Sequence, residues 1–240
     1  MSHFEHFSFA DDLELAQAVA SAWLKEVEAA NRAAVAHCVA LSGGRIAWKL
    51  FPVVGVQATA RAVSLKPVHF FWADERCVPP TDPESNFATA RELLFTPLGI
   101  SESQIHRIRG EDPPAAAAQK AGREIRRVVP ANINGQPVLD LIFLGMGEDG
   151  HVASLFPGES EAVMAGEPVY RAVTAAKPPP HRVTLGYGAI AAARQVWVLV
   201  SGAGKEAALR ESLRPGGQTP LARVLRLRPN TRVFSDLPPA

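Results

Sequence analysis

Apolar residues occur along the chain in two alternating patterns, short unbroken runs and helical repeats. An unbroken run is typical of a strand in a parallel sheet whose two faces are both covered by helices. Such runs lie at 35–41, 68–72, 139–144 and 196–200, with shorter candidates at 169–173, 183–187 and, at an expected sheet edge, 231–234. Helices are predicted over 12–31, 44–51, 85–95, 114–129 and 205–213. This alternation predicts an α/β fold with a mostly parallel sheet covered on both faces.

The composition is that of an ordinary globular protein, since 47% of the 240 residues are hydrophobic and 20% are charged. No internal repeat or linker divides the chain, so we expect a single domain over residues 1–240. The net charge of +1 gives no electrostatic basis for nucleic acid or a membrane surface as the main partner. The oligomeric state cannot be read from these features.

Three further observations concern the cellular compartment. No apolar run is long enough to span a bilayer, and the first residues lack the basic start and apolar core of a secretion signal. The two cysteines, Cys38 and Cys77, have neither metal-binding nor redox spacing. We therefore expect reduced thiols and a cytoplasmic protein.

Polar turns follow four of the predicted strands. Glycine-bearing turns lie at 42–45, 145–151 and 201–205, and a charged turn without glycine lies at 74–76. Because the carboxyl ends of parallel strands lie along one edge of a sheet, residues far apart in the sequence can meet there. The sequence therefore predicts a ligand site at this edge.

The turn at 145–151 brings an acid and a histidine, Asp149 and His151, to the end of a buried strand. Its three glycines allow positive φ and close approach of a ligand. A histidine titrates near neutrality, and a neighbouring carboxylate orients it, so His151 is a candidate general base. The alternative is a histidine that only hydrogen-bonds the segment that follows.

Two turns are candidate anion sites. Ser42, Gly43 and Gly44 offer a hydroxyl and backbone N–H groups at a helix N-terminus, although a turn that merely needs small residues would look the same. Lys205 follows a second glycine turn without forming a Walker loop, because Glu206 stands where a Ser or Thr would hold magnesium. A lysine in the first turn of a helix opposes the helix dipole, which favours a bound anion there.

The charged turn Asp74, Glu75 and Arg76 requires partners, because unpaired charges out of water are costly. Structural ion pairing and a functional role explain it about equally well. Arg182, at the start of a predicted strand, looks like an ordinary surface arginine when taken alone.

The turn Gly145–Gly150 also fits the dinucleotide pattern G-x-G-x-x-G. That pattern requires an acid about 20 residues later to hold the ribose. The next predicted strand instead runs into Thr174, Ala175, Ala176 and Lys177, so a nicotinamide cofactor is not expected. No cluster of His, Cys and carboxylate residues has the spacing of metal ligands, so no metal is expected either.

Four segments taken together resemble the 6-phosphogluconolactonase family, which is related to the glucosamine-6-phosphate deaminases. They are Leu41–Gly44, Val68–Phe87 (VHFFWADERCVPPTDPESNF), Leu144–Pro157 (LGMGEDGHVASLFP) and Val200–Lys205. They stand in family order over about four-fifths of the chain, and the second and third are long and specific. The resemblance implies a modified Rossmann-like, three-layer α/β/α sandwich.

The resemblance also implies an activity: hydrolysis of 6-phosphoglucono-δ-lactone to 6-phosphogluconate in the oxidative pentose phosphate pathway, without metal or cofactor. His151 would activate water, Arg76 would stabilise the developing oxyanion, and Asp74 and Asp149 would shape the site. The phosphate would be held by the following residues: Ser42, Gly43, Gly44, Arg182 and Lys205. A δ-lactone is already reactive, so a base, oxyanion stabilisation and orientation suffice without a covalent nucleophile.

One departure and two rival functions remain. The family turn commonly reads Ser-Gly-Gly-Ser-Thr-Pro, whereas this chain continues with Arg45, which would either replace the lost hydroxyls as a phosphate ligand or point into solvent. Glucosamine-6-phosphate deaminases typically carry Asp-Glu-Tyr where this chain has Arg76 third, and they carry a glutamate where this chain has Leu155 or Phe156. The other rival is a sugar-phosphate-binding protein without catalysis.

Overall fold

The computed structural model describes residues 4–166, 168–228 and 230–237. Its centre is a sheet of six parallel strands in the order β1–β11–β10–β7–β2–β3. These strands are β1 (Phe4–Ser8), β2 (His37–Leu41), β3 (Val68–Trp72), β7 (Leu141–Gly145), β10 (Gln195–Val200) and β11 (Thr231–Ser235). All five residues of β2 and five of the six in β10 are buried, which explains their unbroken apolar runs. The predicted α/β class is confirmed.

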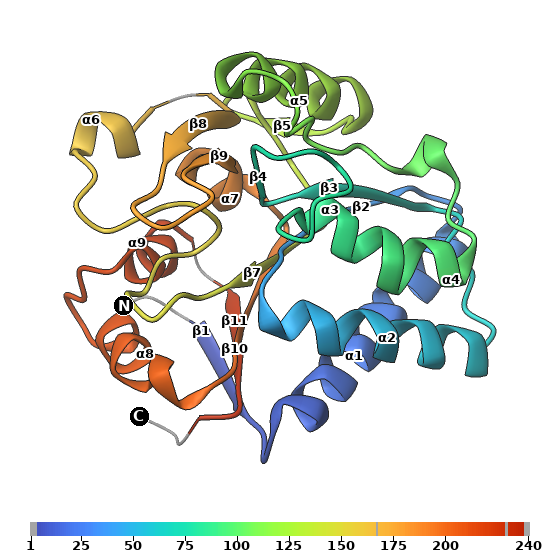
Figure 1. The fold of residues 1–240 in the computed structure, drawn as a ribbon. Helices are drawn as coiled ribbons and strands as arrows, with labels where there is room; N and C mark the ends of the chain where they lie inside the picture. Colours follow the sequence, from blue (N-terminus) through green and yellow to red (C-terminus); the bar gives the residue numbers. More distant parts are fainter. Residues whose placement is uncertain (1–3, 167, 229, 238–240) are drawn as a thin grey trace.

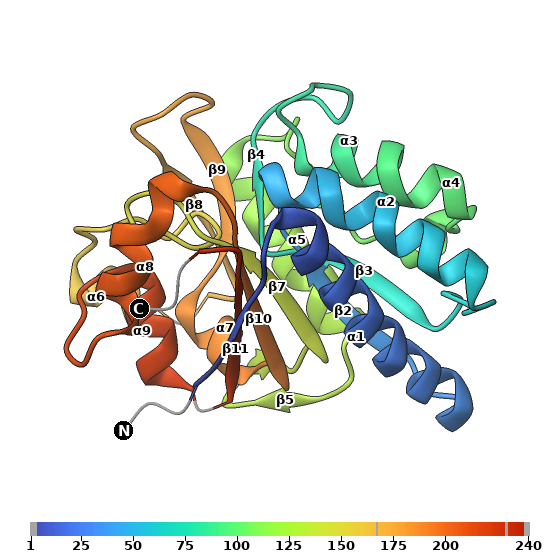
Figure 2. The same cartoon turned by 90° about the horizontal axis from the view of Figure 1, so that it is seen from below.

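Helices cover both faces of this sheet (Figures 1 and 2). On one side lie α1 (Asp12–Ala33) and α2 (Arg45–Ala60), and on the other lie α8 (Glu206–Leu213) and α9 (Pro220–Leu227). Asp11 caps α1 by accepting the N–H groups of residues 13 and 14 at 3.0 and 2.8 Å. Trp23 of α1 packs edge-on against Phe70 and Phe143 of the sheet, with ring centroids 6.3 and 5.5 Å away.

A smaller antiparallel sheet extends from the end of β3. It consists of β4 (Asp74–Arg76), β9 (His181–Leu185) and β8 (Tyr170–Thr174), in that order. Ala73 joins the two sheets, because its N–H donates to Leu41 of β2 and its carbonyl accepts from Leu185 of β9. The small sheet therefore holds its charged strand, β4, beside the carboxyl ends of the parallel strands.

The remaining elements connect these layers. A continuous helical stretch is formed by α3 (Asn86–Ala90), the π-helical turn η1 (Arg91–Phe95) and α4 (Thr96–Leu98). The others are η2 (Glu102–Gln104), α5 (Pro114–Val128), β5 (Asn132–Ile133), β6 (Gln136–Pro137), α6 (Glu161–Met164), α7 (Tyr187–Ala192) and η3 (Ala203–Lys205).

Two sequence-based expectations were wrong. The helix expected to end at Phe51 continues through Pro52 to Ala60, because Val54 and Ala58 still face the core and their burial outweighs the hydrogen bond that proline cannot make. The strand 231–234 was expected at an edge but lies inside the sheet. There β1 pairs with β11 and forms the edge of the sheet in its place. Phe7 and Phe9 of the N-terminal segment stack on Phe234.

Candidate active site

Segments from five parts of the chain (42–46, 74–86, 145–153, 182 and 205) meet near the carboxyl ends of the parallel strands and line a cavity of about 90 Å³. The structure brings nearly all the predicted site residues into its lining: Ser42, Gly43, Gly44, Arg45, Asp74, Arg76, His151, Arg182 and Lys205. Asp149 does not line the cavity but contacts the histidine that does. The lining also includes Gly145 of the predicted glycine turn and four residues that the sequence did not single out: Ile46, Asn86, Met146 and Ala153.

His151 is held by Asp149. The Oδ1 atom of Asp149 lies 2.5 Å from Nδ1 of the ring and accepts the backbone N–H of His151 at 3.1 Å. An ionised carboxylate can only accept, so this contact requires the proton on Nδ1, and a ring with that single proton would leave Nε2 free to act as a base. Burial pushes the pKa of Asp149 up, but the hydrogen bonds and charge of His151 outweigh it, and the net pKa is lowered.

Gly147, in the turn around His151, has no room for a side chain. A Cβ on Gly147 would lie 2.1 Å from both Cε1 and Nδ1 of the His151 ring. The other side of the ring faces Phe156, with centroids 5.0 Å apart. The imidazole is therefore fixed by a carboxylate, a glycine and an aromatic ring.

The turn between β2 and α2 has the features of an anion site. Gly44 is the N-cap residue of α2, with φ +86°, and no side chain caps this helix N-terminus. Its first N–H groups are therefore available to a ligand. Gly43 leaves room for Asn86, since a Cβ there would lie 1.8 Å from Oδ1 of Asn86.

Arg45 and Lys205 lie together beside this turn. Arg45 lies over Gly202, where a Cβ would be 2.8 Å from the guanidinium, and Gly202 has φ +103°. Burial, followed by the charge of Arg45, lowers the pKa of Lys205, while Asp236 and Glu148 act in the opposite direction. Neither cation forms an ion pair within the described part of the chain. Two neighbouring cations without a paired carboxylate favour an anionic ligand.

A second pair of cations lies on the small sheet. Arg76 and Arg182 stand directly opposite each other on β4 and β9, an arrangement that destabilises an antiparallel pair unless an anion compensates it. Arg182 is 7% exposed, and burial followed by the charge of Arg76 lowers its pKa. Its Nε donates to Pro179, and its guanidinium lies over the Phe156 ring. Arg182 is therefore no ordinary surface arginine.

The acidic residues of the charged turn are not held by ion pairs. Oδ2 of Asp74 accepts the hydroxyl of Ser154 at 2.6 Å, and Asn86 donates to the carbonyl of Asp74 at 2.9 Å. Glu75 accepts only from N–H and O–H groups. Only Arg76 is paired, with Glu84 at 3.3 Å. The structural ion pairing considered from the sequence therefore applies to one of the three residues.

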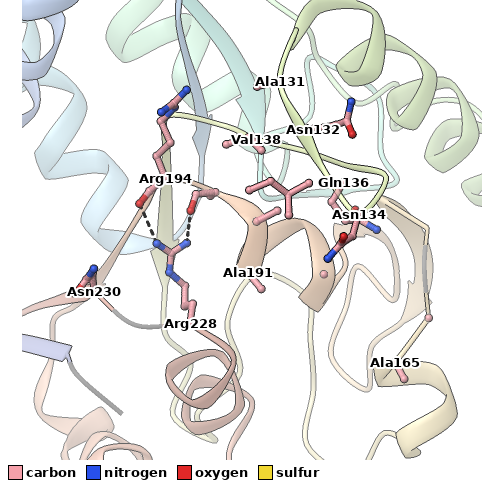
Figure 3. Close-up of a pocket in the computed structure, with 15 residues that line it drawn as sticks. Ala131, Asn132, Asn134, Gln136, Val138, Ala165, Ala191, Arg194, Arg228 and Asn230 are labelled. Carbon is pink, nitrogen blue, oxygen red and sulfur yellow. Dashed lines mark hydrogen bonds between the residues drawn. The ribbon is translucent and has the colours of Figure 1, made fainter. Parts of the chain in front are cut away.

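A larger hollow lies elsewhere, beside the amino ends of β7, β10 and β11, with a volume of about 830 Å³ (Figure 3). Its conspicuous buried cation, Arg228, donates to the backbone carbonyls of Ile190, Ala193 and Arg194. No predicted site residue lines it. The imidazole and the four cations predicted from the sequence converge instead on the smaller cavity.

Two features are absent from the described residues. No helix in this part of the chain is long and apolar enough to cross a membrane. The same residues contain no group of three or more His, Cys, Asp or Glu side chains that could hold a metal ion.

Comparisons with known proteins agree on one family. The model of the family described as glucosamine-6-phosphate isomerases/6-phosphogluconolactonase matches residues 10–233. A 6-phosphogluconolactonase from Haemophilus influenzae is 38% identical over 179 residues, 72% of each chain. One from Streptomyces coelicolor is 31% identical over 210 residues, 85% of this chain and 80% of that one. The crystal structure of 6-phosphogluconolactonase from Thermotoga maritima is 27% identical, with a TM-score of 0.82 over 97% of this chain and 99% of that one.

Proposed function

The chain belongs to the glucosamine-6-phosphate isomerase/6-phosphogluconolactonase family, and from that premise we propose that it hydrolyses 6-phosphoglucono-δ-lactone to 6-phosphogluconate. The observation that carries the proposal is one cavity lined by an imidazole and four cations, Arg45, Arg76, Arg182 and Lys205. Its relatives are named as lactonases, which supports the same reaction.

The proposed chemistry needs only the groups of the cavity. Nε2 of His151 takes a proton from water as the water oxygen attacks the lactone carbonyl carbon. Arg76 stabilises the negative charge that develops on the carbonyl oxygen. When the tetrahedral intermediate collapses, the ring C–O bond breaks and the imidazolium returns its proton to the departing ring oxygen. The products are a carboxylic acid, which ionises, and a free hydroxyl.

In the substrate, the phosphate group lies remote from the reacting carbonyl. When the phosphate is bound, it fixes the position of the lactone ring in the cavity. In our proposal the N–H groups of the Ser42–Gly44 turn, Arg45, Arg182 and Lys205 hold it. This binding free energy orients the carbonyl toward His151 without taking part in bond making.

The family also contains the rival activity, so the residues must decide between the two. Glucosamine-6-phosphate deamination is disfavoured because Arg76 replaces the tyrosine typical of deaminases and because Leu155 and Phe156 stand near the position of their glutamate. Arg76 lines the cavity. A cation in this place favours hydrolysis through an oxyanion over deamination. A binding protein without catalysis would have no need of the Asp149–His151 contact.

Freshly prepared 6-phosphogluconolactone tests the proposal, with acid release followed above the spontaneous rate. We expect a large excess rate that a chelator such as EDTA leaves unchanged. Ammonia release from glucosamine-6-phosphate, measured in parallel, should stay at background. No excess lactone hydrolysis would refute the proposal, and ammonia release would establish the rival.

A further inference from the structure

Glu75 is buried beside the proposed site, where it fastens the segment Glu84–Phe87. It is 2% exposed and accepts four hydrogen bonds. Its Oε1 accepts the N–H groups of Arg76 at 2.7 Å and Asn86 at 2.8 Å. Its Oε2 accepts the Ser85 hydroxyl at 2.9 Å and the Phe87 N–H at 2.8 Å.

No cation that the structure describes is in direct contact with this carboxylate. Within the described residues Glu75 forms no ion pair, and its charge is met by peptide dipoles at the start of α3. Burial raises its pKa to about 7, although all four hydrogen bonds act to lower it. Burying a carboxylate costs free energy that an apolar side chain of similar size would not. Stability alone therefore does not account for a glutamate at this position.

The segment that Glu75 fastens carries two contacts of the cavity. The Glu84 carbonyl accepts from the Arg76 guanidinium at 2.6 Å, so the segment holds the group proposed to stabilise the oxyanion. The Asn86 amide donates to the Asp74 carbonyl and fills the space above Gly43 in the phosphate turn. One carboxylate thus contacts a segment that touches both Arg76 and the turn at Gly43.

We propose that Glu75 is a positioning residue, which holds the Arg76 guanidinium and the Asn86 amide in register by fastening segment Glu84–Phe87 to β4. This inference rests on the proposed lactone hydrolysis. It does not place Glu75 in contact with substrate. A displacement of about 1 Å at a reacting group can lower a rate about a hundredfold.

Glu75→Gln removes this function with minimal change of shape. The amide retains one acceptor oxygen but places an NH2 group against N–H donors, so at least one peptide N–H loses its partner. Glu92→Gln is the matched control, because Glu92 is exposed and lies on the same helical stretch. We expect kcat/KM for the lactone to fall at least tenfold in Glu75→Gln, mostly through kcat. Glu92→Gln should stay within about twofold of wild type, and Glu75→Asp should be intermediate.

Amide hydrogen exchange over residues 84–87 shows whether the segment has been released. Faster exchange there together with unchanged kcat and KM would overturn the inference. If Glu75→Gln does not fold, Ser85→Ala serves instead, because it removes one of the four contacts. We then expect kcat/KM to be two- to fivefold lower, and an unchanged kcat/KM would overturn the inference.

If the wild-type chain itself does not hydrolyse the lactone, the proposed function fails. The positioning role of Glu75 is then tested by the binding of inorganic phosphate, measured by calorimetry. Weaker binding in Glu75→Gln than in Glu92→Gln supports positioning, and equal binding overturns it.

Discussion

Asp149→Asn tests whether the carboxylate makes His151 an effective base. Asparagine keeps an oxygen that can accept the backbone N–H of His151, so the turn should retain its shape. The change removes the negative charge that lies 2.5 Å from Nδ1. Because an amide can donate as well as accept, the side chain no longer selects the tautomer with its proton on Nδ1 rather than on Nε2.

The expected loss follows from that one contact. A hydrogen bond to a charged group contributes about 1.5–3 kcal/mol, and about 1.4 kcal/mol corresponds to a tenfold change in rate. The Asp149 side chain is 52% exposed, so water replaces part of the lost interaction and the smaller values apply. We therefore expect kcat/KM for 6-phosphogluconolactone to fall about ten- to thirtyfold.

The assay follows acid release from fresh lactone near neutral pH, with the melting temperature measured alongside. Asp12→Asn is the matched control, because it removes the same charge at the start of α1, far along the chain from the catalytic turn. If the Asp149→Asn variant keeps at least half of the wild-type kcat/KM and its melting temperature is unchanged, the carboxylate does not orient the base.

Three further predictions concern neighbouring residues. Arg45→Gln should raise KM about five- to tenfold with kcat nearly unchanged, because one of the cations proposed to hold the phosphate is lost; an unchanged KM in steady-state kinetics would place Arg45 outside the site. Gly43→Ala should destabilise the fold by about 1–3 kcal/mol in a urea titration and lower kcat/KM, because its Cβ would lie 1.8 Å from Oδ1 of Asn86. Gly55→Ala in α2 has open space around the new Cβ and should be as stable as wild type in that titration. The pKa of Glu75 is raised from 4.5 to about 7, so the folded state binds this proton more tightly than the unfolded state, and the free energy of unfolding should fall by about 3 kcal/mol as pH rises from 4.5 to 7. Because other groups titrate in that range, the measured quantity is the difference in free energy of unfolding between wild type and Glu75→Gln at each pH. A difference that does not change with pH contradicts the raised pKa of Glu75.

The parallel sheet could be predicted because its information is local. Burial on both faces imposes an unbroken apolar run on the central strands, and β7 and β10 show it plainly. The glycine turns that follow such runs could be assigned to one edge of the sheet by a general rule of parallel sheets. Convergence of Ser42, His151 and Lys205 on one cavity follows from that rule.

The small antiparallel sheet could not be predicted in the same way. Strand direction and partner are not contained in the local pattern of β8 and β9, so the burial of Arg182 beside Arg76 was invisible in the sequence. The environment of Glu75 depends likewise on a segment ten residues further on. A run of three charges cannot reveal whether its partners are cations or peptide N–H groups.

The most direct measurement is the rate of lactone hydrolysis above the spontaneous background in His151→Ala, compared with wild type at equal protein concentration. The ring is 29% exposed and its loss should leave the melting temperature nearly unchanged. We expect a loss of about a hundredfold or more, the contribution of a positioned general base. A folded His151→Ala that hydrolyses the lactone at the wild-type rate would contradict the central claim that this imidazole activates the attacking water.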